Sequence, residues 1–264
     1  MKIAIIGAGN MGGAIAYGLA ASGGFAAGNI VCSNPSTPKL DALKAKYDII
    51  ATTTDNIAAA ADADMVVVAV KPWLAEGVVQ EIKSAFDTPS KILVSVVADT
   101  SLATLREWVA DKAHQPAIFR VIPNTAISVG ESMTFVSADG ATTQQVDAVV
   151  EMFSTMGEVM LVGEKILEAG MVLASCGIAF ALRYVRAAAE GGVELGIPAA
   201  QATKVVAATL KGAAELLLQN GSHPEQEIDK VTTAGGITIK GLNEMEHAGF
   251  TSAVIRGLKA SAGK

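Results

Sequence analysis

The sequence has few of the residues that most often carry metal, redox or acid–base chemistry. Its 264 residues include two cysteines, Cys32 and Cys176, and three histidines. The cysteines are too far apart in sequence to form a metal-binding or redox motif. No Ser-His-Asp order, catalytic carboxylate pair or metal-ligand spacing is evident. We therefore expect no bound metal, and we expect a protein of a reducing cytoplasm.

An excess of basic residues is also missing. Lys and Arg number 20 against 26 Asp and Glu, so the formal net charge is −6. Because contacts to phosphate need clustered cations, nucleic acid is not an expected partner. Hydrophobic residues make up 51% of the chain and charged residues 17%, which predicts a folded protein with a sizeable core.

Long hydrophobic runs are lacking too. Ala169–Leu182 is an uncharged stretch of 14 residues, flanked by Glu168 and Arg183. A helix needs about 20 apolar residues to cross a bilayer. We therefore predict a buried helix here and no membrane partner. Met1 leads directly into an apolar strand, so we expect no signal peptide.

What the sequence does have is a glycine motif near its start. Lys2–Ile6 is an apolar run of the size of a buried strand, and an Ala-rich segment typical of a helix begins at Asn10. Between them the glycines have the spacing G-x-G-x-x-G, which in this context predicts a dinucleotide site. The alternative is an ordinary glycine-rich turn of an α/β protein. The predicted pyrophosphate-binding residues are Gly7, Ala8, Gly9, Asn10, Met11 and Gly12.

Strand-like and helix-like segments alternate over residues 1 to about 110, which predicts a parallel sheet with right-handed crossovers. The expected strands, after the first, are Ile30–Ser33, Met65–Val70, Lys91–Val97, Ala117–Val121, Met133–Val136 and Val159–Val162. The expected helices between them are Lys39–Lys46, one opening at Pro72, Ser101–Ala110 and Thr143–Thr155.

Strand signals stop after Val162. The tail predicts helices at Glu164–Glu194, Ala199–Gln219, Glu225–Lys230, Gly236–Ala248 and Ser252–Lys259. The fold class is therefore α/β, a doubly wound sheet in residues 1–162 followed by an all-helical domain in residues 163–264. The tail has more apolar helix faces than it can bury alone, which predicts a dimer. A compact monomeric helical cap is the alternative.

The end of the second predicted strand indicates which dinucleotide binds. NAD-specific sites usually place an acidic residue there, but Asp41 is the first carboxylate after this strand. Ser33 and Asn34 are neutral, and Lys39 adds a cation that suits a 2′-phosphate. We predict NADPH, with NADH still possible. The alternative is that these residues only form a turn.

Four motifs in register resemble the pyrroline-5-carboxylate reductase family over nearly the whole chain. They are Gly7–Met11 with Ala14-Ile15, then Ala69-Val70-Lys71-Pro72, then Arg120–Thr125, then Gly235-Gly236 with Thr238 and Gly241-Leu242. The resemblance implies a Rossmann domain, and a helical domain that forms an interlocked homodimer, often assembled further into decamers. It implies NADPH-dependent reduction of 1-pyrroline-5-carboxylate to L-proline, the last step of proline biosynthesis.

The resemblance also implies site residues. Ala69, Val70, Lys71 and Pro72 would lie beside the cofactor and Asn56 near the adenosine, while Val231–Thr238 would bind the cyclic imino acid. Thr238 occupies the family position for a hydroxyl that hydrogen-bonds the imine nitrogen. Backbone N–H groups of Gly235, Gly236 and Ile237 would bind the substrate carboxylate.

Two further site residues are predicted because they lie at the ends of strands, where open α/β sheets bind ligands. Lys71 supplies a cation there, and we assign it to the catalytic site with Thr238. Asn124 is predicted to bind either the nicotinamide amide or its own loop. The alternatives to these functional roles are that Lys71 is merely solvated, and that Gly235, Gly236 and Thr238 only start a helix.

The substrate half departs from the family pattern at Ala174–Phe180 and at Thr233–Ile237, and Pro35 stands where an Arg often follows Asn34. Two other functions therefore remain open. A β-hydroxyacid-type dehydrogenase would use a lysine in the first tail helix, but none follows Lys165 there. A non-catalytic NADP-binding regulatory protein is the other.

Overall fold

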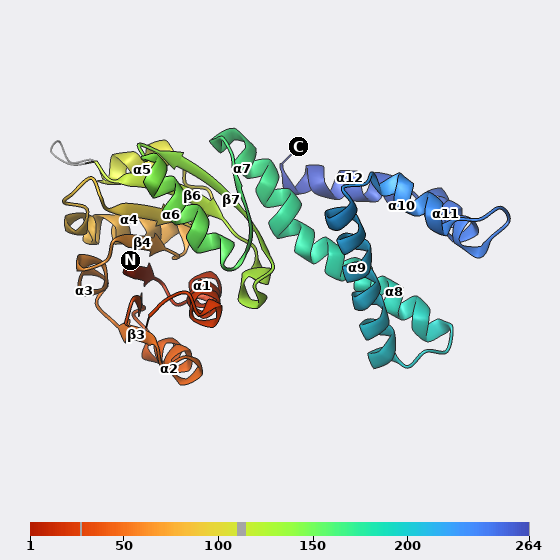
Figure 1. The fold of residues 1–264 in the computed structure, drawn as a ribbon, viewed down its shortest axis with the longest axis horizontal. Helices are drawn as coiled ribbons and strands as arrows, with labels where there is room; N and C mark the ends of the chain where they lie inside the picture. Colours follow the sequence, from red (N-terminus) through yellow and green to blue (C-terminus); the bar gives the residue numbers. More distant parts are fainter. Residues whose placement is uncertain (27, 110–114, 264) are drawn as a thin grey trace. The chain divides into compact units, whose positions relative to one another are not determined.

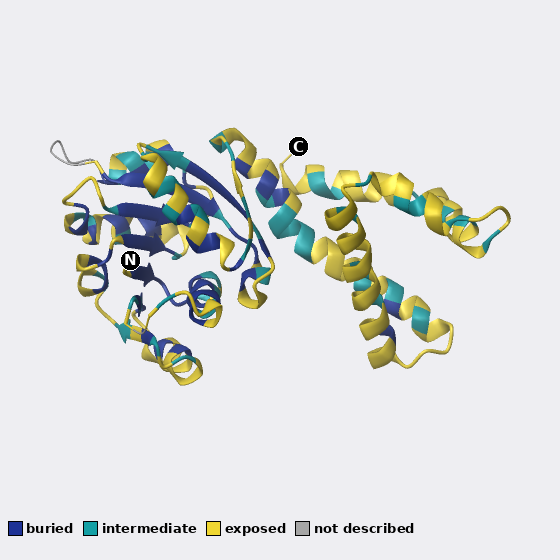
Figure 2. Cartoon of the chain, in the orientation of Figure 1, coloured by how far each residue is buried: buried dark blue, intermediate teal, exposed yellow. Residues whose placement is uncertain are grey.

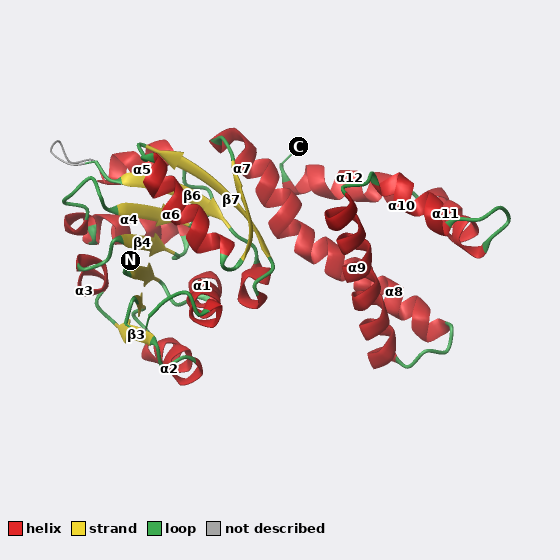
Figure 3. Cartoon of the chain, viewed as in Figure 1, coloured by secondary structure: helices red, strands yellow, loops and turns green. Residues whose placement is uncertain are grey.

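The chain forms two compact units, Met1–Ser175 and Cys176–Lys264, in a computed structural model that describes residues 1–26, 28–109 and 115–263 (Figure 1). Strands and helices mix in the first unit, whereas the described residues of the second form helices and loops only (Figure 3). The predicted fold class is confirmed. The predicted boundary at residues 162/163 follows the last strand, and the contacts divide the chain later, within one long helix.

An eight-stranded sheet with the order β3-β2-β1-β4-β5-β6-β7-β8 is the centre of the first unit. Strands β1 to β6 are parallel and follow the order of a doubly wound dinucleotide-binding sheet. Their apolar runs suit strands that are covered on both faces. The strands are β1 (Ile3–Ile6), β2 (Ile30–Ser33), β3 (Ile50–Thr53), β4 (Met65–Val68), β5 (Ile92–Ser95), β6 (Ala117–Ile122), β7 (Ser132–Asp139) and β8 (Gly157–Leu161).

Strand β7 runs antiparallel to β6, and β8 is parallel to β7. A short 3₁₀ turn, η2 (Thr125–Val129), joins β6 to β7. A connection this short reverses the chain, because a parallel neighbour needs a crossover of a dozen or more residues. The predicted parallel sheet therefore holds for six strands, and the two late strands extend it in the other direction.

Helices cover both faces of the sheet, which is buried between them (Figure 2). In β1, Ile3 and Ile5 pack towards one face, and Ala4 and Ile6 towards the other. Helices α1 (Asn10–Ser22), α2 (Thr37–Lys46) and α6 (Thr143–Ser154) contribute to the first face, and α3 (Asn56–Ala61), α4 (Pro72–Glu81) and α5 (Leu102–Val109) to the second.

Two elements, β3 and α3, were not predicted. Strand β3 is a four-residue edge strand that ends in two threonines, and α3 has only six residues. Both are too short to show a clear hydrophobic period. The predicted helix Ser101–Ala110 is confirmed as α5, except that Ala110 lies outside the described residues.

A 31-residue helix, Glu164–Glu194, starts the helical tail. It comprises α7 (Glu164–Gly170), a π-helical stretch (Met171–Cys176) and α8 (Gly177–Glu194). Among the described residues this helix is long and apolar enough to cross a membrane, by length and composition alone, and only 17% of its most apolar window is buried. Leu173 is 65% exposed and Leu182 is 62% exposed. The prediction of a buried helix at Ala169–Leu182 is therefore wrong for the single chain.

The remaining helices are close to the predicted ones: α9 (Ala199–Asn220), α10 (Pro224–Val231), α11 (Ile237–His247) and α12 (Phe250–Ser261). Helices α8 and α9 pack against each other after the turn at Gly196-Ile197-Pro198. An apolar groove of about 840 Å³ is lined by side chains that include Phe180, Tyr184, Leu210, Met245, Phe250 and Val254. The second unit thus leaves a broad apolar surface uncovered.

A charge pair between a buried arginine and a partly exposed glutamate ties the first helix of the tail to the sheet. Arg120, on β6, is 6% exposed, and its Nη1 lies 3.3 Å from Oε1 of Glu164. The same oxygen accepts a hydrogen bond of 2.7 Å from the backbone N–H of Leu102, at the start of α5. Glu164 is the only carboxylate that pairs with Arg120 among the described residues, so removing it leaves a buried guanidinium uncompensated.

We predict that Glu164→Ala lowers the free energy of unfolding by about 3 kcal/mol, because an unpaired buried charge is costly. Urea denaturation of the whole chain measures this change as a lower midpoint. Glu168→Ala is the matched control, since Glu168 is exposed one turn further along. Equal midpoints for the two variants would show that the Arg120 pair is not stabilising.

Candidate functional site

The glycine turn between β1 and α1 is closely packed at two of its three glycines. Gly7 has a φ of 108°, and a Cβ there would lie 2.6 Å from the carbonyl oxygen of Ala69. A Cβ on Gly12 would overlap the carbonyl oxygen of Gly7. By contrast, a Cβ on Gly9 would have nothing within 4 Å. Gly7 and Gly12 therefore serve packing, whereas Gly9 leaves an open approach to the backbone.

Helix α1 presents free backbone donors at this open place. Gly9 is its N-cap, with an extended backbone and no side chain to cap the first turn. The N–H groups of a first helical turn have no partner within the helix, and the helix dipole favours an anion beside them. This geometry suits a pyrophosphate at the predicted residues Ala8 to Gly12.

Asn34, just after β2, braces the same turn. Its Oδ1 accepts a hydrogen bond of 3.1 Å from the N–H of Ala8, and its Nδ2 donates to the carbonyl oxygen of Ser36 at 3.1 Å. The side chain is nearly buried. Asn34 therefore connects the glycine turn to the loop that precedes α2.

Ser33 lies beneath the site. It has no exposed surface, and its hydroxyl donates a 2.7 Å hydrogen bond to Oδ1 of Asn56. The Nδ2 of Asn56 in turn donates to Oε2 of Glu81 at 2.9 Å. The hydroxyl of Ser33 thus orients Asn56, the residue predicted to lie near the adenosine, and a direct contact of Ser33 with the cofactor stays a prediction.

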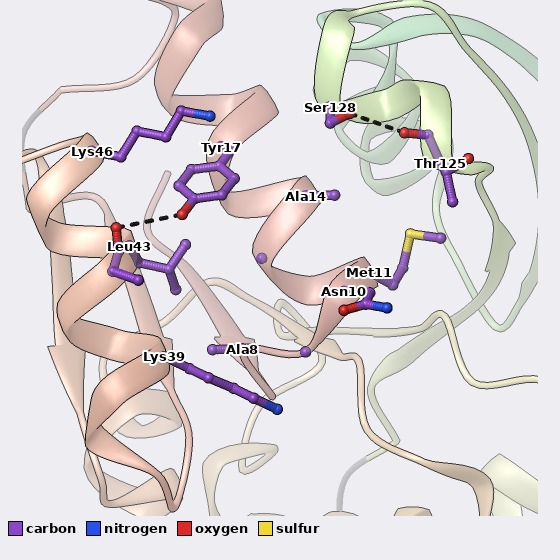
Figure 4. A pocket seen from close by; sticks show the side chains of 13 residues that line it. Ala8, Asn10, Met11, Ala14, Tyr17, Lys39, Leu43, Lys46, Thr125 and Ser128 are labelled. Carbon is purple, nitrogen blue, oxygen red and sulfur yellow. Dashed lines mark hydrogen bonds between the residues drawn. The ribbon is translucent and has the colours of Figure 1, made fainter.

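A pocket of about 690 Å³ opens beside the glycine turn (Figure 4). Helices α1 and α2 and the turn η2 supply its walls. Lys39 extends from α2 towards the turn that carries Ala8, and the Nζ of Lys46 lies 4.2 Å from the ring centroid of Tyr17. The described lining includes two cations and no carboxylate, which suits phosphate groups. It consists of Ala8, Gly9, Asn10, Met11, Gly13, Ala14, Tyr17, Lys39, Ala42, Leu43, Lys46, Thr125 and Ser128.

Sequence reasoning missed Tyr17, Lys46 and Ser128 as lining residues, whereas Thr125 belongs to the Arg120–Thr125 motif. Tyr17 carries a signal that was available, because it follows Asn10 and Ala14 at helical spacing on one face of α1. Ser128 carried none, since only the fold brings η2 next to α1.

The segment Ala69-Val70-Lys71-Pro72 follows β4 and meets the glycine turn. The N–H of Ala69 donates a 2.9 Å hydrogen bond to the carbonyl oxygen of Ile6, at the end of β1. Lys71 is exposed and precedes the first residue of α4, Pro72. Strands β1 and β4 are neighbours at the point where the strand order reverses, with β2 and β3 on one side and β5 and β6 on the other. Doubly wound sheets bind dinucleotides at this point, and these residues lie there.

Asn124, after β6, binds its own loop. Its Oδ1 accepts a 2.9 Å hydrogen bond from the N–H of Ala126, and its Nδ2 donates to the carbonyl oxygen of Ala174 at 3.5 Å. Ala174 belongs to the π-helical stretch, and Ser175 donates from its hydroxyl to the carbonyl oxygen of Pro123. Asn124 is 4% exposed, so of its two predicted roles the structure supports the loop contact.

Cys32 takes no part in this chemistry. It is fully buried in β2, and burial raises the pKa of its thiol to about 12. The thiol therefore stays protonated near neutral pH.

The predicted substrate residues lie at the start of α11 in the second unit. Gly235 has a φ of 69°, and Gly236 is the N-cap, with its N–H donating 2.9 Å to the carbonyl oxygen of Thr233. No side chain caps this helix, and both Ile237 and Thr238 are exposed. The segment thus offers uncapped N–H groups beside a hydroxyl, the combination that a small carboxylate with a neighbouring nitrogen requires.

Comparisons with known proteins agree with this geometry. Residues 164–264 match the family model described as pyrroline-5-carboxylate reductase dimerisation, and residues 2–99 match the model described as NADP oxidoreductase coenzyme F420-dependent. Pyrroline-5-carboxylate reductase 2 of Dictyostelium discoideum is 37% identical, over 100% of this chain and 91% of that protein. Pyrroline-5-carboxylate reductase 1 of the same organism is 38% identical, and this chain spans 49% of its length.

A solved structure is similar over the whole chain. Pyrroline carboxylate reductase of Plasmodium falciparum, with NADP bound, superimposes with a TM-score of 0.87 at 26% identity. The match covers 99% of this chain and 95% of that one.

Because Gly9 and Gly12 are packed differently, an added methyl group should have a different effect at each position. Gly9→Ala should fold with a near-normal melting temperature but bind NADPH at least about tenfold more weakly, because its Cβ takes the space of an approaching phosphate. Gly12→Ala should lose several kcal/mol of stability, since its Cβ overlaps the Gly7 carbonyl.

Thermal unfolding and NADPH fluorescence titration measure the two effects separately. Gly24→Ala is the control, since a Cβ there would contact only the hydroxyl of Ser22, outside the pocket. Normal NADPH affinity in Gly9→Ala would remove the glycine turn from the pyrophosphate site.

Proposed function

The chain belongs to the pyrroline-5-carboxylate reductase family, and on this premise we propose that it reduces 1-pyrroline-5-carboxylate to L-proline with NADPH, the last step of proline biosynthesis. The observation that carries this function is the full-length identity of 37% to a reductase of that name. The open approach at Gly9 and the cationic pocket beside it agree with an NADP-type cofactor.

Residues of the first unit are suited to hold the cofactor. The uncapped first turn of α1 would bind the pyrophosphate, and Asn56, held by Ser33 and Glu81, would contact the adenosine. Lys39 is the cation that the pocket offers to the 2′-phosphate. Ala69 to Pro72 would lie beside the other half of the dinucleotide.

When bound, NADPH supplies the hydride that adds to the imine carbon. We assign the substrate carboxylate to the backbone N–H groups of Gly235, Gly236 and Ile237, and the ring nitrogen to the Thr238 hydroxyl. A hydrogen bond to that nitrogen orients the ring and holds its proton as the double bond is reduced. We assign Lys71 to the same reaction, as the exposed cation at the end of a central strand.

We propose a homodimer formed by the helical tail, and a decamer as its further assembly. The dimerisation family model begins at Glu164, the first residue of the exposed apolar helix. A second copy, rather than a membrane, then covers that helix. The net charge of −6 offers no support for a nucleic-acid partner. Sedimentation at the mass of one chain, without detergent, would contradict this assembly.

Lys39→Ala tests the cofactor. We expect the KM for NADPH to rise about tenfold or more while the KM for NADH stays unchanged, because only NADPH carries the 2′-phosphate. Steady-state rates with both cofactors measure the ratio. Lys44→Ala is the control, since Lys44 is exposed on α2 but does not line the pocket. An unchanged ratio in Lys39→Ala would place the 2′-phosphate elsewhere.

The Thr238 hydroxyl tests the reaction. Purified protein should oxidise NADPH when given 1-pyrroline-5-carboxylate, and Thr238→Ala should lower kcat about tenfold to a hundredfold with an unchanged Kd for NADPH. Thr238→Ser keeps the hydroxyl and should retain most of the activity. NADPH binding without any turnover by the wild-type protein would instead favour a regulatory protein.

A further inference from the structure

The loop between β5 and α5 contains one residue in an unfavourable backbone conformation. Asp99 has a φ of 60°, the only positive φ of a non-glycine residue in the part of the chain that the structure describes. The left-handed region is costly for residues with a Cβ, although aspartate tolerates it better than most. Glycine would adopt this turn without cost. Such outliers persist where the surroundings hold them, and they cluster at functional sites.

The surroundings hold this loop at both ends. The N–H of Val97 donates to Oγ of Ser95 at 3.3 Å, and the N–H of Leu102 donates to Oε1 of Glu164 at 2.7 Å. Ser101 caps the start of α5 through the N–H of Thr104 at 3.0 Å. Thr100, directly after Asp99, is 5% exposed. Asp99 itself is exposed at the tip of a braced turn.

The carboxylate of Asp99 is not used within the fold. Among the described residues, none forms a hydrogen bond or an ion pair with it. Its carboxylate therefore does not form the hydrogen bond of an Asx turn with the described backbone around it. The charge is therefore exposed and free to meet a ligand.

The position of the loop in the sheet indicates which ligand group the Asp99 carboxylate would meet. It follows β5, which pairs with β4, and the N–H of Val96 donates to the carbonyl oxygen of Val68 at 3.0 Å. The glycine turn at β1 and the Asn56 network beyond β2 lie on the other side of the reversal in strand order. A dinucleotide that crosses this reversal, with its adenosine near Asn56, directs its nicotinamide towards β4 and β5. Asp99 thus lies at the reacting end.

We propose that the Asp99 carboxylate lies close to the positive charge of the protonated ring nitrogen, in addition to the Thr238 hydroxyl, and makes the site select the cationic form of the substrate. This inference rests on the proposed reduction of a cyclic imine. Hydride addition forms a C–H bond at the imine carbon, and the π pair of C=N moves onto a nitrogen that already carries its proton. One positive charge leaves the ring and appears on the oxidised cofactor. A carboxylate beside the ring favours the protonated, cationic form of the imine, which is the form that accepts the hydride.

The test compares two ligands that differ in charge at one atom. L-Proline has a cationic ring nitrogen, and cyclopentanecarboxylate has the same ring and carboxylate with carbon in its place. Calorimetry measures the binding of each to the full-length enzyme saturated with NADP⁺. Asp99→Asn should weaken L-proline binding about tenfold, because a charged acceptor is replaced by a neutral one, and leave cyclopentanecarboxylate unchanged.

Two further variants separate charge from backbone shape. Asp99→Gly removes the strain as well as the charge and should show the same selective loss. Asp147→Asn removes an exposed carboxylate on α6 and should change neither affinity. Equal affinities in wild type and Asp99→Asn, an equal loss for both ligands, or a loss of NADPH affinity instead, would each overturn the proposal.

Failure of the Asp99 proposal can be distinguished from failure of the proposed function. Wild-type protein that oxidises NADPH with 1-pyrroline-5-carboxylate, together with unchanged L-proline affinity in Asp99→Asn, refutes only the role of Asp99. Wild-type protein that does not oxidise NADPH with 1-pyrroline-5-carboxylate and binds neither ligand refutes both.

Discussion

The contact between the first turn of α1 and the end of β1 is the constraint on which the rest of the first unit depends. Gly12 lies so close to the Gly7 carbonyl that no side chain fits between them, and Gly7 lies against Ala69. This contact brings the ends of β1, β4 and α1 to one point. The free N–H groups of the helix then face the reversal in strand order, and every proposed cofactor contact is positioned relative to them.

Around that point, buried polar groups serve to position other groups. Asn34 holds the glycine turn, Ser33 holds Asn56, and Asn124 connects η2 to the π-helical stretch. Each is nearly or fully buried with its hydrogen bonds made, which is the usual condition for a polar group in a protein interior. The groups left exposed and able to meet a ligand are fewer, and they include Lys39, Lys71 and Asp99.

In the helical tail, by contrast, apolar side chains remain exposed. Its first helix is apolar enough to be buried, yet Leu173 and Leu182 remain exposed in one chain. An uncovered apolar surface of this kind marks an interaction site. The family model that matches residues 164–264 is described as a dimerisation domain, which agrees with the proposal that a second copy covers this surface.

The sequence by itself determined the fold class, the glycine turn and most of the helices, because these follow from local signals: apolar runs, glycine spacing and helical periodicity. It also indicated the cationic character of the pocket through Lys39. Only the tertiary structure decided that Ser33 is buried beneath Asn56, that Asn124 binds its loop, and that Thr125 and Ser128 line the pocket. The exposure and the hydrogen-bond partners of a residue depend on which distant segments of the chain pack against it. A local sequence pattern does not contain that information. The left-handed conformation of Asp99 belongs to the same class, since contacts at both ends of its loop impose it on a residue that would locally prefer otherwise.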